Sequence, residues 1–343
     1  MNTTLLDGLW QEGRDFLGVR YPILCGAMTW ISDATLVTAV SKQGGFASLA
    51  AGNMPGEALA AEIAKTAAQV KGSFAVNLVT IAPNFPAHKE AVLQSSVPIV
   101  IFAGNFPKKH DVAQMKEAGK KVLSFASTDS IADQMVRFGV DGLILEGSEA
   151  GGHIGHVSTM ILLQQVLFHK PNVPVFVGGG IATGRMLAHM ILMGAAGVQM
   201  GTRFVMSAEC NAHPKLKERF VRARAREAMS TPEYDKRLPI VAVRALKNKS
   251  TEAFGRLQLE LLQLMNEGKI SHMEAQYRVE GFWMGGLRKA AVEGDVDYGS
   301  CMAGQSVGLV DKIQPMSEIF AELLQEGEAE LASIQARLAG IKR

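Results

Sequence analysis

Eight short apolar segments recur along the first two thirds of the chain, and each ends in small residues. They are YPILCGA (21–27), GGFASLAA (44–51), FAVNLV (74–79), VPIVIFAG (97–104), KVLSFAS (121–127), DGLILEG (141–147), VPVFVGGG (173–180) and GVQMGTRF (197–204). Successive segments start 20 to 32 residues apart, which leaves room for a strand, a helix and two loops. Because the segments are almost continuously apolar rather than alternating, they indicate strands buried on both faces, as in a parallel sheet.

The stretches between these segments begin and end with residues that are typical of helix termini. Residues 55–70 open with Pro and keep apolar side chains on one face, and residues 127–139 start with Ser-Thr-Asp and stop at Gly. Eight consecutive strand–helix units predict an α/β protein with a (β/α)8 TIM barrel. A doubly wound sheet is the alternative, but it usually has five or six strands, and no GxGxxG follows any strand here.

The alternation of apolar segments and helical stretches ends after residue 204. Residues 213–229, 251–268 and 315–338 are amphipathic helical stretches, and no strand-like segment stands out between them. We therefore expect a barrel over residues 1–204 and a mainly helical extension over 205–310 that folds against it. Within 311–343 we expect a C-terminal helix that packs on the barrel or in a subunit interface.

Composition excludes several classes of protein. Of the 343 residues 48% are hydrophobic, enough for a large core, and the net charge of +2 argues against a dedicated nucleic-acid binder. No run of eighteen apolar residues could span a membrane, and the N-terminus lacks the apolar core of a signal peptide. The three cysteines (Cys25, Cys210 and Cys301) are scattered, which favours a reducing, cytoplasmic setting.

Glycines crowd the ends of the predicted strands, where the active sites of (β/α)8 enzymes lie. Gly179 and Gly180 follow the seventh strand and Gly201 follows the eighth, which matches the usual phosphate-binding corner of such barrels. For any single loop these glycines could merely turn the chain. Taken together they favour a flat ligand with one phosphate, such as flavin mononucleotide (FMN).

The segment EGSEAGGHIGH (146–156) follows the sixth strand and carries two histidines. His153 and His156 form HxxH without a third ligand at a recognisable spacing, so no metal site is predicted. The letters HIGH also occur in class I aminoacyl-tRNA synthetases, but their downstream Lys-Met-Ser-Lys-Ser loop is absent. We expect His156 on the surface, and His153 on a mobile glycine-flanked loop, where it can donate a proton or polarise a carbonyl.

Several motifs resemble a known superfamily. YPILCGAMTWISDATLVTAVSKQGG, EGSEAGGHIG, GGGIATG and GTRF are similar to the nitronate monooxygenase / 2-nitropropane dioxygenase superfamily of flavin barrels. ECNAHPKLKE (209–218), AVRALKN (242–248) and EGDVDYGSCMAGQSVGLV (293–310) resemble its flavin-dependent enoyl-[acyl-carrier-protein] reductase branch. The resemblance spans roughly residues 15–325. It implies that the barrel over residues 1–204 binds FMN and that the extension over 205–310 forms a substrate lid. It also implies NADH or NADPH as the hydride source and His153 as the catalytic residue. Some reductases of this branch also depend on a monovalent cation.

The resemblance also implies which residues hold the flavin. Those expected to contact it are Gly26, Ala27, Met28, Asn77, Glu146, Gly152, Gly179, Gly180, Gly201 and Thr202, with Met302, Gly304 and Gln305 closing the site. Relatives usually read Gln-Gly-Gly-Met where this chain has Cys-Gly-Ala-Met (25–28). Ala27 needs an ordinary φ where glycine could take a positive one, so the flavin edge could be contacted differently there.

The sequence therefore predicts an FMN oxidoreductase that reduces the trans-2 double bond of enoyl thioesters in fatty-acid synthesis. The alternatives on the same scaffold are a nitronate monooxygenase and an NAD(P)H:quinone reductase, and outside enzymes a flavin-binding accessory module of a larger synthase. Expected partners are an acyl carrier protein, docked on the basic stretch KLKERFVRARAR (215–226), and a second copy of the chain in a homodimer. That basic stretch could equally be a solvated helix face.

Overall fold

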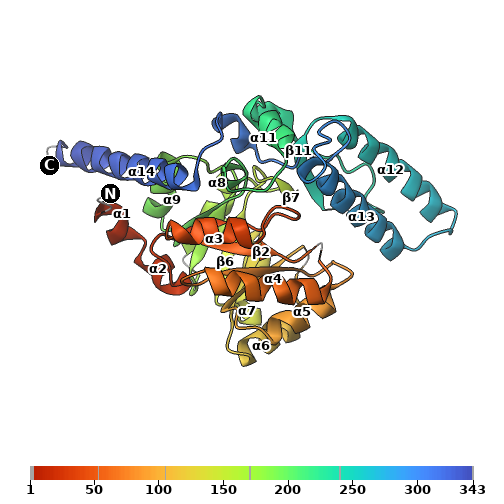
Figure 1. The fold of residues 1–343 in the computed structure, drawn as a ribbon, viewed down its shortest axis with the longest axis horizontal. Helices are drawn as coiled ribbons and strands as arrows, with labels where there is room; N and C mark the ends of the chain where they lie inside the picture. Colours follow the sequence, from red (N-terminus) through yellow and green to blue (C-terminus); the bar gives the residue numbers. More distant parts are fainter. Residues whose placement is uncertain (1–3, 53, 105, 170, 239–240, 342–343) are drawn as a thin grey trace.

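The eight predicted strands form a closed parallel barrel (Figure 1). The structure is a computed structural model, and it describes residues 4–52, 54–104, 106–169, 171–238 and 241–341. The barrel strands are β1 (Ile23–Cys25), β2 (Phe46–Ala50), β3 (Ala75–Val79), β4 (Ile99–Ala103), β5 (Lys121–Ala126), β6 (Gly142–Glu146), β8 (Val175–Gly178) and β9 (Gly197–Met200). The barrel closes where β1 pairs with β9, with Leu24 beside Gln199. The predicted (β/α)8 fold is confirmed.

Helices follow the barrel strands in turn and surround them. They are α3 (Ala34–Lys42), α4 (Gly56–Gln69), α5 (Phe85–Leu93), α6 (Lys109–Glu117), α7 (Asp129–Phe138), α8 (Thr159–Gln165), α9 (Gly184–Leu192) and the short α10 (Thr202–Val205). Two helices, α1 (Thr4–Leu9) and α2 (Gln11–Leu17), precede β1. The Ser-Thr-Asp start of α7 acts as expected, because Thr128 caps the helix by accepting from the backbone N–H of Ile131.

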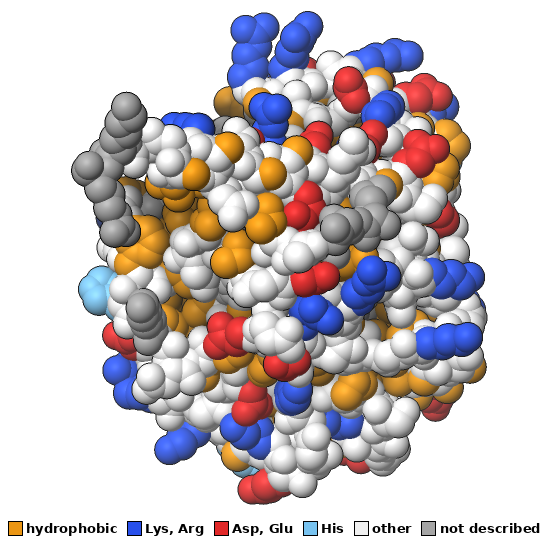
Figure 2. Space-filling model, turned by 90° about the vertical axis from the view of Figure 1, so that its left-hand side faces the viewer, with side chains coloured by type: hydrophobic (Ala, Val, Ile, Leu, Met, Phe, Trp, Pro, Cys, Tyr) orange, Lys and Arg blue, Asp and Glu red, His pale blue; other side chains and the backbone are white. Residues whose placement is uncertain are grey.

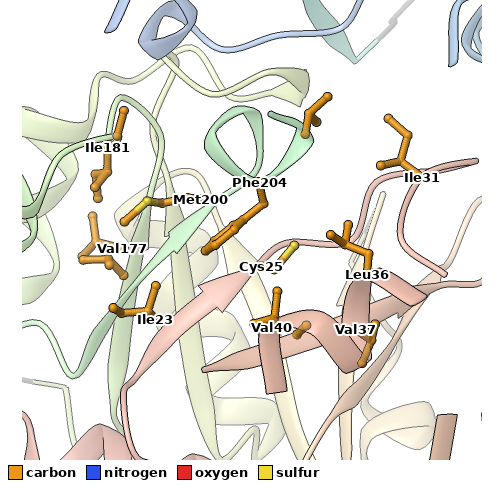
Figure 3. Packing of buried hydrophobic residues seen from close by; sticks show 14 of the residues in the cluster. Ile23, Cys25, Ile31, Leu36, Val37, Val40, Val177, Ile181, Met200 and Phe204 are labelled. Atoms are coloured by element: carbon orange, nitrogen blue, oxygen red, sulfur yellow. The ribbon is translucent and has the colours of Figure 1, made fainter. Parts of the chain in front are cut away.

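Side chains alternate between the two faces of each barrel strand. On β6, Ile144 packs inside the barrel with Phe46 and Phe176, whereas Leu143 and Leu145 pack outward against the helices. Figure 3 shows this outer layer, in which Cys25 lies among Leu36 of α3 and Phe204 of α10. Burial raises the pKa of the Cys25 thiol above its ordinary value, so this cysteine is a packing residue that faces away from the barrel interior.

The extension after residue 204 contains strands as well as helices, so the expectation of no strand there is wrong. β10 (Ala228–Ser230) and β11 (Ala242–Leu246) form an antiparallel sheet with β7 (Gly152–Ile154), in the order β10-β11-β7. The predicted helix over 213–229 is shorter: α11 (Pro214–Val221) is followed by a 3-10 turn, η2 (Ala225–Glu227). These strands are short, and pairing with the distant β7 stabilises them, which a local pattern cannot reveal.

Two long helices form a hairpin at one end of the molecule, and the C-terminal helix lies at the other (Figure 1). The hairpin consists of α12 (Lys249–Asn266) and α13 (His272–Ala291), and a short turn, η3 (Gln305–Leu309), leads to α14 (Met316–Ala339). α14 packs on α9 at Gly184, where an added Cβ would lie 2.0 Å from the Leu323 carbonyl oxygen. The Gly184 backbone N–H also donates to Glu326 at 2.7 Å.

The end of the molecule that carries both termini has no large area of one charge (Figure 2). Basic and acidic side chains lie intermixed over most of this face, beside a group of hydrophobic side chains. Among the described helices, none combines the length and apolar character needed to cross a membrane.

Candidate functional site

A cavity of about 330 Å³ opens at the carboxyl ends of the barrel strands. Thirteen of the fourteen residues selected from the sequence line it: Gly26, Ala27, Met28, Asn77, Glu146, Gly152, His153, Gly179, Gly180, Gly201, Thr202, Met302 and Gly304. Gln305 is the exception and does not border the cavity. Its backbone N–H donates to the Glu149 carbonyl oxygen at 2.9 Å, so it anchors the segment that leads into η3.

Strand parity explains why polar side chains reach this cavity. Glu146 is two residues beyond Ile144 and Asn77 two beyond Ala75, and both Ile144 and Ala75 point into the barrel. Glu146 and Asn77 therefore face inward as well, one layer nearer the mouth. Gln199 on β9 lines the cavity in the same way, although the sequence analysis did not select it.

The glycine corner is built from the loops after β6 and β8. Gly179 and Gly180 have φ values of 93° and 75°, a region that side-chain-bearing residues rarely adopt. Glu149 joins the two loops, because its carboxylate accepts from the Thr159 backbone N–H at 2.9 Å and lies 2.8 Å from the Thr159 hydroxyl. That hydroxyl is also 3.3 Å from the Gly179 carbonyl oxygen. The corner is thus fixed in place without a ligand.

The segment 302–304 covers one side of the cavity. Gly304 donates its backbone N–H to the Thr202 hydroxyl at 3.0 Å, which ties the segment to the start of α10. An added Cβ at Gly304 would lie 2.9 Å from the Glu149 carbonyl oxygen, so only glycine fits there without a shift. Met302 pairs with Ala245 of β11 in an isolated bridge, which links this side of the cavity to the three-stranded sheet.

His153 belongs to strand β7, so the expectation of a mobile loop is wrong. It lies opposite Val243 of β11, and that pairing fixes its backbone. Its Nε2 is 3.3 Å from the Glu280 carboxylate of α13. Burial alone would lower the pKa of His153, but Glu280 and, to a smaller degree, Glu146 more than offset this and raise it. His156 is exposed, as expected.

Glu146 is the second ionisable group of the cavity. Burial raises its pKa to about 8, against an opposing effect of the neighbouring His153. At neutral pH the carboxyl is therefore protonated and can donate a hydrogen bond, which an ordinary glutamate cannot do. The cavity holds an imidazole that favours its charged form beside a carboxyl that favours its neutral form.

The lid side of the cavity comes from one face of α13. Glu280, Trp283, Met284 and Leu287 line it at helical spacing. The sequence analysis named none of them and did not predict this helix. In the stretch EGFWMGGL (280–287) the apolar residues Trp283, Met284 and Leu287 share one helical face with the charged Glu280, so the sequence pattern does not show what this face covers.

The cavity fits a flat cofactor with a phosphate. Gly26, Gly201 and Gly152 remove side chains from its wall, and the nearest atom to an added Cβ on Gly201 or Gly152 is a methionine sulfur at 3.5 or 3.6 Å. The positive-φ pair Gly179–Gly180 turns backbone, rather than side chain, toward one end, as phosphate-binding loops do. Ala27 has an ordinary φ, because Trp30 is the one described non-glycine residue with a positive value. The backbone at residue 27 therefore does not require glycine, and a different flavin contact there stays a prediction.

A closed (β/α)8 barrel with a glycine-walled cavity and an imidazole in its wall is the arrangement expected of a flavin-dependent oxidoreductase. The chain belongs to the nitronate monooxygenase family, whose profile matches residues 12–91 and 80–326.

Individual relatives differ in their named activities. The structure of FabK from Thermotoga maritima is similar with a TM-score of 0.84 and 34% identity, covering 94% of this chain and 98% of that one. A (3aS,4S,5R,7aS)-5-hydroxy-7a-methyl-1-oxo-octahydro-1H-indene-4-carboxyl-CoA dehydrogenase from Mycobacterium tuberculosis is 28% identical, over 94% of this chain and 97% of that protein. A probable nitronate monooxygenase from Staphylococcus aureus is 25% identical, over 93% and 98%.

Proposed function

We propose that the protein is an FMN-dependent reductase of enoyl thioesters that uses NADH or NADPH. The observation that carries the proposal is the position of His153, whose imidazole stands in the cavity wall below an apolar lid face that includes Trp283 and Leu287. An acyl chain would pack against that face, while the imidazole donates to the thioester oxygen. The likeness to FabK over almost the whole chain supports this choice.

The residues of the chain have separate tasks in this scheme. Gly179, Gly180 and Gly201 would hold the phosphate end of FMN, and Asn77 and Glu146 would border its ring. FMN bound there supplies hydride transfer from the nicotinamide to the β-carbon of the acyl substrate. Negative charge would develop on the thioester oxygen, where His153 would stabilise it by hydrogen bonding. A proton from His153 or from solvent would then complete the reduction at the α-carbon. The lid face excludes water from the reacting atoms.

A nitronate monooxygenase is the second candidate, favoured by the family profile and by the Staphylococcus aureus relative. In that case His153 would act on a nitronate in the same cavity. The Mycobacterium tuberculosis relative is named for a carboxyl-CoA substrate, which favours a thioester over a nitronate. A quinone reductase remains the third candidate on this scaffold.

One experiment separates these activities. The purified protein should release FMN rather than FAD on denaturation, and NADH or NADPH should bleach it without oxygen. Portions of the reduced protein are then mixed with an enoyl thioester, with a nitronate plus oxygen, or with a quinone. We expect the enoyl thioester to restore the oxidised spectrum fastest. Release of FAD, or a response to quinone alone, would contradict the proposal.

Replacing His153 tests its assigned role. In His153→Ala, FMN binding and flavin reduction by NAD(P)H should be nearly unchanged. Reoxidation by enoyl thioester should slow by roughly 10²–10⁴-fold, the usual contribution of one acid–base group. Rapid mixing measures the two half-reactions separately, and His156→Ala, an exposed neighbour, is the control. Equal losses in both half-reactions would assign His153 a purely structural role.

The structure reduces the number of basic residues in 215–226 that could contact an acyl carrier protein. Lys217 is buried and donates to the carbonyl oxygens of Ser207 and Cys210 at 2.7 and 2.6 Å, so it cannot meet a partner. Arg222 and Arg226 are exposed beyond the end of α11. Reversing both to Glu should raise KM for an enoyl carrier protein and leave KM for a short enoyl-CoA unchanged. An equal change for both substrates would exclude docking here.

Two further expectations stay predictions. Sedimentation of the FMN-bound protein would test the homodimer, and enoyl reduction in buffers with and without potassium would test dependence on a monovalent cation. Among the described residues, no group of three His, Cys, Asp or Glu side chains is arranged to hold a metal ion.

A further inference from the structure

We propose that Glu280 is a positioning residue: its carboxylate, supplied by the lid helix α13, keeps the imidazole of His153 oriented and positively charged for the reaction. The inference rests on the proposed function in one respect, the use of His153 as a hydrogen-bond donor to substrate. It adds that the donor is complete only when α13 is seated on the barrel mouth.

The first observation is the placement of an acid on the apolar face of α13. Glu280 lines the cavity with Trp283, Met284 and Leu287, and its side chain is only 18% exposed. A carboxylate in such a place is costly unless a positive group compensates it. Among the described residues its ion-pair partner is His153, at 3.3 Å from Nε2.

The second observation is the orientation of the imidazole. Its Nε2 is buried and faces the Glu280 carboxylate at 3.3 Å, a contact that is an ion pair when the imidazole is protonated. Nδ1 of His153 has no hydrogen-bond partner among the described residues. It is also not one of the fully buried unpaired polar atoms, so it is accessible from the cavity. Nδ1 is therefore the nitrogen that can donate to substrate, while Nε2 faces the lid.

The third observation is that α13 is fastened to the barrel close to Glu280. The indole N–H of Trp30, in the loop after β1, donates to the Met284 carbonyl oxygen at 3.1 Å, and Arg288 lies over the Trp30 ring at 5.9 Å. Trp30 has a φ of 68°, a strained value for a bulky residue that persists only where surrounding contacts enforce it. This fastening sets the position of Glu280.

The charges around His153 leave Glu280 as the group that balances it. Glu146 on β6 also faces the imidazole, but burial raises its pKa to about 8, so it is neutral at neutral pH. Arg244 on the paired strand β11 is directed elsewhere, to the carbonyl oxygens of Ser148 and Ala228. Among the described residues, Glu280 thus makes the largest contribution to raising the pKa of His153, and Glu146 adds a smaller one.

Glu280→Gln tests the proposal because it removes the charge and keeps the shape. The matched control is Glu274→Gln on the same helix, an exposed residue paired with Arg278 at 2.8 Å. Histidine NMR of the FMN-bound protein, assigned with His153→Gln, follows the protonation of His153 directly. Its midpoint should fall to lower pH in Glu280→Gln and stay unchanged in Glu274→Gln. An unchanged midpoint in folded, FMN-bound Glu280→Gln would overturn the proposal.

The pH profile gives a second readout that a structural role would not move. The high-pH limb of flavin reoxidation by enoyl thioester should shift to lower pH in Glu280→Gln. In the alkaline range reoxidation should slow about tenfold, the effect of a single pKa unit, while reduction by NAD(P)H keeps its rate. Glu280→Asp should restore part of the limb. A profile of unchanged shape that is only scaled down would also refute the proposal.

The two tests fail separately. If no enoyl thioester reoxidises the flavin while the NMR midpoint still moves in Glu280→Gln, the proposed function is wrong and the role of Glu280 toward His153 stands. If the thioester reacts and the midpoint does not move, the proposed function stands and the role of Glu280 is lost.

Discussion

Replacing Glu146 by glutamine should change how the stability of the flavin-free protein depends on pH. Burial raises the pKa of Glu146 from 4.5 to about 8, so the folded state holds a proton that the unfolded chain releases. Between these two pH values the folded state binds more protons than the unfolded one. The contribution of Glu146 to stability is therefore fully present below about pH 4.5 and is lost as pH rises through about 8. The glutamine side chain of the variant cannot titrate, so it has no such dependence.

The size of the effect follows from the pKa difference. At 1.36 kcal/mol per pKa unit, the step from 4.5 to about 8 corresponds to about 5 kcal/mol for a carboxyl wholly removed from water. Glu146 borders an open cavity, where water partly solvates its charged form, so this figure is an upper bound and we expect about 4 kcal/mol, which still leaves the carboxyl protonated at neutral pH. The wild-type protein should lose this much free energy of unfolding relative to Glu146→Gln across that pH window.

Urea denaturation of both proteins at a series of pH values measures the effect. Groups that titrate identically in both proteins contribute equally to the two free energies of unfolding, so their contributions drop out of the difference. That difference should change by about 4 kcal/mol across the window and be constant above it. A difference that is independent of pH would show that Glu146 is charged in the folded protein, and would refute the assignment of a neutral carboxyl in the cavity.

Two further substitutions test the frame of the site. Lys217→Met should lower the free energy of unfolding by about 2–4 kcal/mol, because two buried carbonyl oxygens lose their donor; Lys215→Met, at an exposed position, should have little effect in the same denaturation assay. Gly180→Ala should weaken FMN binding about tenfold in a fluorescence titration, because alanine is strained at a φ of 75° in the cavity wall. The control is Gly194→Ala, because Gly194 has a φ of 103° but lies away from the cavity. This variant should be less stable and keep its FMN affinity. An equal loss of affinity in both variants would argue against Gly180 as a phosphate-loop residue.

The barrel could be predicted because its signal is local. Each strand is buried on both faces, so it appears as a continuous apolar segment such as VFVG (175–178), and each helix between strands carries its own start and stop residues. Placement of Asn77 and Glu146 at the cavity then follows from the alternation of side chains along a strand. The packing role of Cys25 follows from the same rule, because it lies one residue after the inward-facing Leu24.

The extension could not be predicted to the same depth, because its elements depend on partners far away in the chain. β11 has a charged residue, Arg244, at its centre, so its sequence does not resemble a buried strand. In the structure the guanidinium donates to the carbonyl oxygens of Ser148 and Ala228. β7 reads as a glycine loop because Gly152 and His153 have little strand propensity, and it becomes a strand only by pairing with β11. Both errors arise from one long-range contact.

That contact explains why the chemistry of the site is divided between two parts of the chain. Most residues expected to hold a flavin lie at the ends of barrel strands, whereas Gly152, Met302 and Gly304 come from β7 and the extension. His153 stands one step away, on a strand fixed by the extension through Val243, and its charge partner Glu280 comes from a helix of that extension. The position of the acid–base group therefore depends on the docking of the extension onto the barrel. Related barrels that keep the glycine corner and replace α13 could bind the same cofactor and act on different substrates, which fits the range of activities named among the relatives of this chain.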